Sequence, residues 1–269
     1  MKKRLKAWIP TLVLVTFFLG TRFADAHLFW IETDNKATIQ GKQEIRIFLG
    51  HPDMPDTNIL PELVNTLVHR PDGSTASLSP EKEGDHWKAS VALDQNGDYI
   101  ITSTRKPGFF DPKWHDHDAP ARIMKDCAKI IIHNRSAKGN WSKAVNQELE
   151  IVPLVKPYNL HIGDTFKARV LYNGKSVRGD YSAALATQNI HDVQQIQRGT
   201  AQKDGLFSIK TDKAGMWVVM VEYGVEESGA WIATHDLIYK NKTYYTKGDK
   251  LLYSTVKNRN AMTFWVDGE

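Results

Sequence analysis

The feature of the sequence that most limits its fold is a series of short runs in which apolar and polar residues alternate. Ile45, Ile47 and Leu49 share one side of EIRIFL, and strand-like runs recur in HWKASVAL, NGDYIITS and CAKIIIH. A period of two is the pattern of a half-buried β-strand. After residue 26 no stretch carries a long apolar stripe with helical spacing, and prolines interrupt PDMPDTNILPELVNTL so often that it has room for a single helical turn at most. We therefore expect an all-β protein.

The strand-like runs fall into two groups. After CAKIIIH, residues 136–147 (SAKGNWSKAVNQ) are small and polar without alternation, and LEIVPL, TFKARVLYNGK, GLFSIKTDKAG, MWVVMVEY and NAMTFWV follow. Short strands without helices between them favour antiparallel sandwiches over a parallel sheet. We predict two antiparallel β-sandwich domains, similar in architecture to immunoglobulin domains, at residues 27–135 and 148–269, joined by a linker at 136–147. Asn173-Gly174 predicts a tight hairpin turn.

The chain begins with the pattern of a secretory signal peptide. Four basic residues among the first six precede an apolar run from Ala7 to Gly20, which carries no charge. The run is shorter than the roughly 20 apolar residues that span a bilayer, so a removable signal is the better interpretation. Ala24 and Ala26 supply the small residues of a cleavage site. We expect residues 1–26 to be removed, which makes His27 the first residue of an exported protein.

Removal of the leader changes the charge of the chain. Five of the 35 basic residues and one of the 31 acidic residues lie in the leader, so that 30 of each remain and the formal charge of +4 falls to zero. The mature sequence therefore gives no sign of a nucleic-acid-binding surface. A single cysteine, Cys127, excludes an internal disulfide. No second long apolar run follows the leader, so we expect no transmembrane segment in the mature form.

A histidine at a free N-terminus offers unusual chemistry, because its α-amino nitrogen and its imidazole can chelate one metal ion together. The pKa of an unperturbed α-amino group is about 7.7–8.0, so the amine can lose its proton to a metal near neutral pH. Imidazole suits nickel, copper, zinc and iron. His27 is therefore a candidate ligand, although a cleavage that happens to expose a histidine explains the pattern equally well.

His51 is the second candidate. It follows an alternating strand and a glycine in FLGHPDM, and Pro52 favours an extended chain there. The imidazole should therefore stand at the rim of a sandwich, where functional loops gather. A lone histidine at a strand end is more often an exposed polar residue, so this position gains meaning only if a partner ligand lies near.

The third candidate is the stretch KWHDHD. In an extended segment His115 and His117 would point to one side, so that two imidazoles could share a metal with carboxylates nearby. A solvated acidic loop would look the same. His235, followed by Asp236, is a weaker fourth candidate.

Signs of catalysis are sparse. The sequence contains no GxSxG, HExxH or glycine-rich phosphate loop. Its eight tryptophans fit sandwich cores, but Trp30, Trp87, Trp114 and Trp217 could also line a sugar-binding surface.

Several stretches together resemble a known family. AHLFW behind a signal, FLGHP at the end of an early strand, and above all EIVPL-x-KPY-x-L-x-x-GD are similar to the periplasmic accessory proteins of bacterial nickel and cobalt uptake. These proteins accompany transporters of the energy-coupling-factor type and are often described as a domain of unknown function. The resemblance covers most of the mature chain and implies a transthyretin-like C-terminal half. It aligns the family's two histidine motifs with Ala26-His27 and His51-Pro52.

The resemblance implies a periplasmic protein, not an enzyme, that binds nickel or cobalt and supports its delivery to a membrane transporter. On this hypothesis His27 and His51 hold the ion, completed by His115 or His117; the two latter residues are inferred from the sequence pattern alone. Two alternatives stay open. One is a copper-dependent oxidative enzyme acting on polysaccharides through the N-terminal histidine, and the other is a carbohydrate-binding or adhesion sandwich without a metal.

Overall fold

A computed structural model of the chain describes residues 27–33, 41–51, 54–55, 64–115, 117–135, 139–188, 196–239 and 242–268. The predicted signal peptide, residues 1–26, and most of the proline-rich segment after His51 lie outside these residues. Within the described residues the chain forms strands and one short 3-10 helix, η2 (Pro112–His115). The expectation of an all-β protein is confirmed. Of the helices that the structure describes, none has the length and apolar character needed to cross a membrane.

The described strands form four sheets. The first sheet has the order β1-β2-β7-β6, with β3 beside β2, and its strands are β1 (Leu28–Glu32), β2 (Gly41–His51), β3 (Met54–Pro55), β6 (Glu81–Glu83) and β7 (His86–Leu93). A small sheet contains β11 (Leu149–Pro153), β13 (Thr165–Tyr172), β14 (Lys175–Ser176) and β17 (Leu206–Lys210). A separate ribbon pairs β19 (Leu237–Tyr239) with β20 (Lys242–Tyr245).

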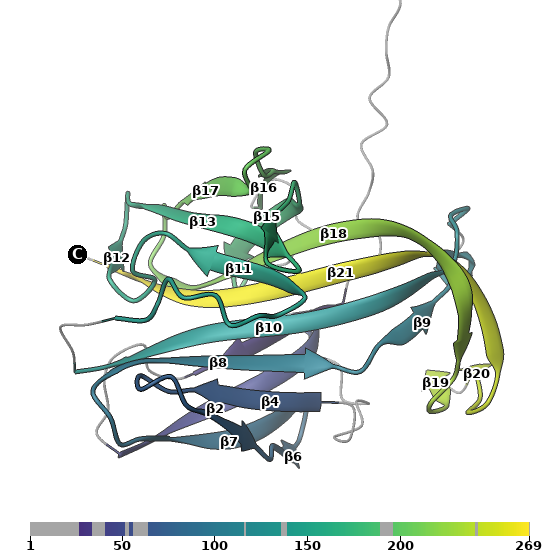
Figure 1. The fold of residues 1–269 in the computed structure, drawn as a ribbon, viewed down its shortest axis with the longest axis horizontal. Coiled ribbons are helices and arrows are strands. Elements are labelled where there is room, and N and C mark those ends of the chain that lie inside the picture. The colour runs from purple at the N-terminus through teal and green to yellow at the C-terminus, as the bar shows by residue number, and fades with distance from the viewer. Residues whose placement is uncertain are drawn as a thin grey trace, which may run out of the picture.

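The largest sheet runs through both halves of the chain. Its order is β16-β15-β18-β21-β10-β8-β4-β5, with β12 beside β21 and β9 beside β10. The strands are β4 (Val64–His69), β5 (Thr75–Leu78), β8 (Gly97–Arg105), β9 (Gly108–Phe110), β10 (Arg122–Asn134), β12 (Leu160–His161), β15 (Asp180–Leu185), β16 (Gln197–Thr200), β18 (Gly215–Ile232) and β21 (Lys250–Asp267). In Figure 1, β10 and β21 cross the middle of the molecule side by side, with the smaller sheet above them and the first sheet below.

The two halves meet in this sheet through a parallel ladder. β10 pairs with β21 in parallel from Arg122↔Thr255 to Ile130↔Thr263. The sequence led us to expect antiparallel pairing throughout, and the difference has a topological reason. A parallel pair needs a long crossover connection, and here the whole C-terminal sandwich lies between the two strands. The proposed domain boundary at residues 136–147 stays a prediction. Strands from before and after these residues belong to one continuous sheet.

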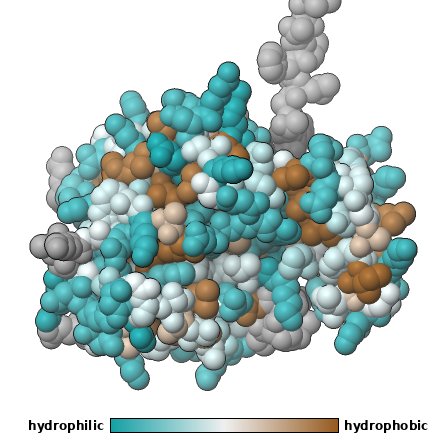
Figure 2. All heavy atoms as spheres, in the orientation of Figure 1, coloured by the Kyte–Doolittle hydropathy of each residue, from teal (hydrophilic) through white to brown (hydrophobic). Residues whose placement is uncertain are grey.

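Two main cores lie on opposite faces of the long sheet. Trp87, Ile45 and Ile47 of the first sheet pack with Ile101 and Ile130 in one core. On the other face, the small sheet contributes residues such as Phe166, whose ring stacks on Phe264 of β21 at a centroid distance of 4.3 Å. Figure 2 shows that the outer surface in this view is mostly hydrophilic, with separate apolar patches.

Asn173 and Gly174 form the predicted hairpin turn. Tyr172 of β13 pairs with Lys175 of β14, so that two residues make the loop. Both have positive φ angles, 48° at Asn173 and 74° at Gly174. This is the conformation of a type I′ turn, for which Asn-Gly is the preferred sequence.

A buried ion pair joins the long sheet to the small one. Lys129 of β10 is fully buried, and its ammonium group donates to Glu150 Oε1 and, at 3.0 Å, to the carbonyl oxygen of Ile151. The same Glu150 oxygen accepts the amide of Val145 at 2.8 Å. Burial lowers the pKa of Lys129, and the Glu150 charge opposes that shift.

We expect Lys129→Met to lower the free energy of unfolding by about 3–5 kcal/mol, because it leaves a buried carboxylate without its counter-ion. The double variant Lys129→Met/Glu150→Leu should lose distinctly less, since neither charge then remains in the core. Urea unfolding at neutral pH measures both values. Equal losses in the single and double variants would contradict this account of the pair.

Candidate metal site

The β1–β2 ladder ends at Leu28 and Gly50, one residue short of positions 27 and 51. β1 pairs with β2 in antiparallel fashion, with Leu28 opposite Gly50 and Phe29 opposite Leu49. The same register, continued by one residue, would set position 27 opposite position 51. Directly opposed residues of an antiparallel pair have Cα atoms about 4.5–5.5 Å apart. For His51 the structure describes the backbone, which also pairs with Met54 of β3.

The start of β1 is held firmly by the core. Leu28, Phe29, Trp30 and Ile31 have exposed fractions of 4% or less. Phe29 and Ile31 pack in the core beneath the first sheet, whereas Leu28 and Trp30 belong to a second cluster with Val218 of β18 and Ala261 of β21. His27 itself is half-buried and takes part in contacts with its surroundings. A residue attached to four buried neighbours has little freedom to move.

Gly50 shapes the chain just before His51. It pairs with Leu28 on one side and with Pro55 of β3 on the other, and its φ angle is 122°. Side chains other than glycine rarely adopt this conformation, so the glycine of FLGHP has a backbone role. It allows β2 to pass between two partners and still present position 51 at the end of the strand.

The other two predicted ligands lie on a different element. His115 ends η2, and His117 follows in a loop attached to β9 and β10. The side chain of His117 is exposed, and its backbone amide donates to the carbonyl of Pro112 at 3.1 Å. The extended conformation assumed from KWHDHD is wrong for Pro112–His115, which are helical, because Trp114 turns inward to pack on Phe109. A shared site with His27 stays a prediction for His115 and His117.

His235 has protein partners for both ring nitrogens. Its Nδ1 lies 3.1 Å from the hydroxyl of Thr234, and its Nε2 lies 3.3 Å from the hydroxyl of Tyr245. The ring also packs among Trp231 and Tyr245. These contacts give His235 a structural role in an aromatic cluster. Within the described residues, no group of three or more His, Cys, Asp or Glu residues could hold a metal ion.

Three of the tryptophans considered for sugar binding are core residues. Trp30, Trp87 and Trp217 are 1%, 0% and 2% exposed. Trp114 packs on Phe109 and Tyr244. The three buried indoles are therefore not available for stacking on a sugar.

Sequence reasoning missed a row of charged residues that crosses the long sheet. Asp126 of β10 lies opposite Arg259 of β21, which lies opposite Glu222 of β18. Arg259 Nε donates to Asp126 Oδ1 at 2.7 Å, and Arg105 Nε donates to Asp126 Oδ2 at 2.9 Å. Lys257 Nζ lies 2.7 Å from Glu222 Oε2. The sequence did contain an indication of this row. Asp126 in DCAKIIIH and Arg259 in NRNAMTF are charged residues that share one side of their strand with apolar residues.

The charges in this row control the titration of Asp126. Burial raises the pKa of this carboxyl group, but the charges and hydrogen bonds of Arg259 and Arg105 more than offset burial and lower the pKa to about 2. Asp126 is thus ionised throughout the neutral range. Its carboxylate holds two guanidinium groups, from β8 and β21, on either side of β10.

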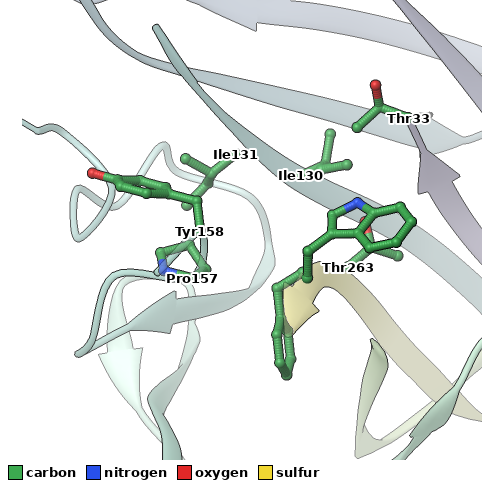
Figure 3. Close-up of a pocket in the computed structure, with 8 residues that line it drawn as sticks. Thr33, Ile130, Ile131, Pro157, Tyr158 and Thr263 are labelled. Atoms are coloured by element: carbon green, nitrogen blue, oxygen red, sulfur yellow. The ribbon is translucent and has the colours of Figure 1, made fainter. Parts of the chain in front are cut away.

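A second missed group joins the two halves of the chain. His133 Nδ1 lies 2.7 Å from Asp98 Oδ1, the ring of Tyr158 stacks on His133 at 4.3 Å, and the Trp141 amide donates to Asp98 Oδ2 at 3.0 Å. Beside it is a small pocket whose lining includes Tyr158 and Pro157 on one side and Thr33 on the other (Figure 3). Its Thr263 hydroxyl already donates to the carbonyl of Ile31 at 2.6 Å. We interpret this region as structural.

The ion pairs of Asp126 should make stability depend on pH. A carboxyl group with a lowered pKa in the folded state contributes stability above its unfolded pKa, and this contribution is lost as pH falls through the folded pKa. We expect a loss of about 2 kcal/mol between pH 4 and pH 2 in the wild-type protein. Asp126→Asn should be less stable than wild type at neutral pH and should lack this part of the acid dependence.

Urea unfolding at several pH values measures the effect, with Asp212→Asn, a change at an exposed position, as the control. An Asp126→Asn variant with the same acid dependence as wild type would show that the arginines do not lower the pKa of Asp126.

Comparison with known proteins places the chain in context. Residues 24–225 match the family described as a domain of unknown function, DUF4198. A search of curated proteins gave no match.

Solved structures resemble the chain only distantly. A DUF4785 family protein from Legionella pneumophila is 13% identical with a TM-score of 0.28; the match covers 82% of this chain and 54% of that one. A 1.5-MDa bacterial ice-binding adhesin is 10% identical with a TM-score of 0.24, covering 91% and 65%. The FN1–FN3 domains of chicken CNTN1 are 10% identical with a TM-score of 0.19, covering 86% and 64%. The chain thus spans about half to two thirds of these structures, and at such scores the likeness carries no argument about function.

Proposed function

The chain belongs to the DUF4198 family, and we propose that it binds a divalent transition metal ion, nickel or cobalt, through His27 and His51. The observation that carries the proposal is the β1–β2 register, which ends at Leu28 opposite Gly50 and, if continued by one residue, would set position 27 opposite position 51. Two histidines far apart in the sequence would thus come to adjacent backbone positions at the end of one ladder.

The proposed donor set consists of three nitrogen atoms from two residues. After cleavage at Ala26, His27 supplies its α-amine and one imidazole nitrogen, and His51 supplies a second imidazole nitrogen. Such a set needs only two residues, because His27 supplies two of the three nitrogen atoms. Imidazole and amine nitrogens suit nickel and cobalt, and metal–imidazole bonds of about 2.0–2.1 Å, the value for zinc, are compatible with neighbouring strands.

The packing of β1 supports a site that exists before the metal arrives. Leu28 to Ile31 are buried on both faces of the strand, so that little conformational entropy remains to be lost at position 27. A bound metal would add stability by mass action, because the unfolded chain does not hold the two histidines together.

The cellular role follows from the resemblance to the accessory proteins of nickel and cobalt uptake. On that basis the protein works in the periplasm after export, is not an enzyme, and supports delivery of the ion to a membrane transporter. The family match begins at residue 24 and thus leaves out nearly all of the apolar leader. His115 and His117 remain proposed additional ligands, which would have to approach the site from the loop after β9.

A comparison of processed and extended protein tests the proposal. We expect nickel chloride to raise the melting temperature of protein that starts at His27, as verified by mass spectrometry. One extra alanine before His27 should weaken nickel binding at least tenfold, because it converts the chelating amine into an amide. His51→Ala should have an effect of similar size.

The matched control is His161→Ala, which removes an exposed histidine from β12. Nickel affinity should not change in this variant. Equal responses of the extended and processed proteins would refute the chelate, and unaltered binding by His51→Ala would remove His51 from the donor set.

In the alternative function, that of a copper-dependent oxidative enzyme, copper would bind to the same three nitrogen atoms. Assays with copper, a reductant and polysaccharides separate the two functions. Oxidised sugar products that depend on His27 would favour the enzyme, and their absence together with nickel binding would favour transport.

A further inference from the structure

The face of the long sheet that carries Asp126 holds more positive than negative charge. The described side chains on it include four cations, Arg105, Arg122, Lys257 and Arg259, and two carboxylates that are buried, Asp126 and Glu222. Two further carboxylates of this face are exposed to solvent, Glu226 opposite Thr255 and Asp180 opposite Glu222, and a fifth cation, Arg198, lies opposite Ser182. Both buried carboxylates are already bound by cations of the same face. A surplus of positive charge therefore remains.

Arg122 is a cation of this face that forms no ion pair with the residues that the structure describes. It is half-buried at the start of β10, and its guanidinium group lies over the ring of Phe110 at 5.0 Å. Its Nε is buried and has no hydrogen-bond partner among the described residues. Burial and the charge of Arg259 lower the pKa of Arg122, whereas the Glu222 charge raises it. A buried donor on a charged group is costly unless a ligand satisfies it.

Lys257 has an open neighbour on this face. It lies opposite Met124 of β10 on one side and opposite Gly224 of β18 on the other. Gly224 is exposed, and a Cβ atom there would meet no atom within 4 Å. Met124 and Gly108 of β9, which lies opposite it, are buried, so a ligand of Lys257 would approach from the side of Gly224.

This charged face begins where β1 begins. Leu28 shares a cluster with Val218, Met220 and Ala261, and the next residues on the same face of those strands are Glu222 and Arg259. β1 runs alongside β21 in this region, as the bond from Thr263 to the carbonyl of Ile31 indicates. We therefore expect the proposed metal site, at the start of β1, to lie near this charged face.

We propose that Arg122 and Lys257 bind a carboxylate of a small chelating molecule, so that the protein takes up its metal as an anionic chelate rather than as a bare ion. This inference rests on the proposed function for its metal, but the carboxylate site can be tested without it. A guanidinium group donates two parallel hydrogen bonds to a carboxylate, and a lysine beside it adds charge without demanding geometry. The amine and imidazoles would then complete the coordination that the chelator leaves open.

The test uses processed wild-type protein and three probes: nickel chloride alone, sodium citrate alone, and nickel citrate. Isothermal titration calorimetry at low salt should detect binding of citrate alone, and nickel citrate should bind more tightly than either component. The affinity for both citrate forms should fall as ionic strength rises, because the contacts are between charges.

Arg122→Gln is the diagnostic variant, since Arg122 makes no ion pair with the described residues that the substitution could break. It should weaken citrate and nickel citrate at least tenfold and leave nickel chloride binding unchanged. The matched control is Lys125→Gln, which removes a positive charge from the same strand. Lys125 faces the other side of the sheet, where it pairs with Glu148, and its loss should alter none of the three affinities.

The outcomes separate the two proposals. In one outcome, nickel chloride binds through His27, but the affinities for citrate and nickel citrate are the same in Arg122→Gln as in wild type. This would overturn the carboxylate site and leave the metal site supported. Citrate that binds through Arg122 while nickel binds in no form would support the carboxylate site and refute the metal site. Wild-type protein that binds neither citrate form would also overturn the carboxylate site.

Discussion

The parallel ladder between β10 and β21 is the constraint on which the rest of the structure depends. β10 closes the first half of the chain, and β21 is its last strand, so that this pairing converts two sets of strands into one continuous sheet. The two main cores then lie on opposite faces of that sheet, and Lys129 and Glu150 fix the small sheet to it from within. A change in the register of this ladder would shift both cores at once.

The candidate metal site is a consequence of the same arrangement. The outer face of β1 would meet water in an isolated sandwich, but here Leu28 and Trp30 are covered by β18 and β21. The far strands of the long sheet therefore hold the start of the mature chain in place. The same two strands carry Glu222 and Arg259 two residues beyond Met220 and Ala261, which belong to the cluster that covers β1.

The sequence was informative where a few neighbouring residues decide the structure. Alternation located most of the strands, and Asn173-Gly174 specified a two-residue turn, because the period of a strand and the φ angles of a turn are local properties. The parallel ladder could not be foreseen, since it joins segments separated by a whole sandwich. The helical turn at Pro112–His115 was missed because the packing of Trp114, rather than local alternation, determines it.

In the candidate site, too, the sequence indicated some residues, and only the fold shows which of them lie together. His27 and His51 attract attention as a possible terminus and a strand end, but only the β1–β2 register brings their backbones together. Asp126, Arg105 and Arg259 look like ordinary charged residues in the sequence. They form one group because three strands from distant parts of the chain align, and a single sequence carries no record of that alignment.

The docking of β1 against the end of the chain also sets the order in which the protein can mature. Thr263, six residues from the C-terminus, donates its hydroxyl hydrogen to the carbonyl of Ile31. A polypeptide whose synthesis is incomplete lacks β21 and so cannot form this contact with β1. Before the leader is removed, moreover, the α-amine of His27 is tied up in a peptide bond. Metal capture on the proposed site is thereby postponed until both synthesis and processing are finished, which would keep the protein from sequestering nickel in the compartment where it is made.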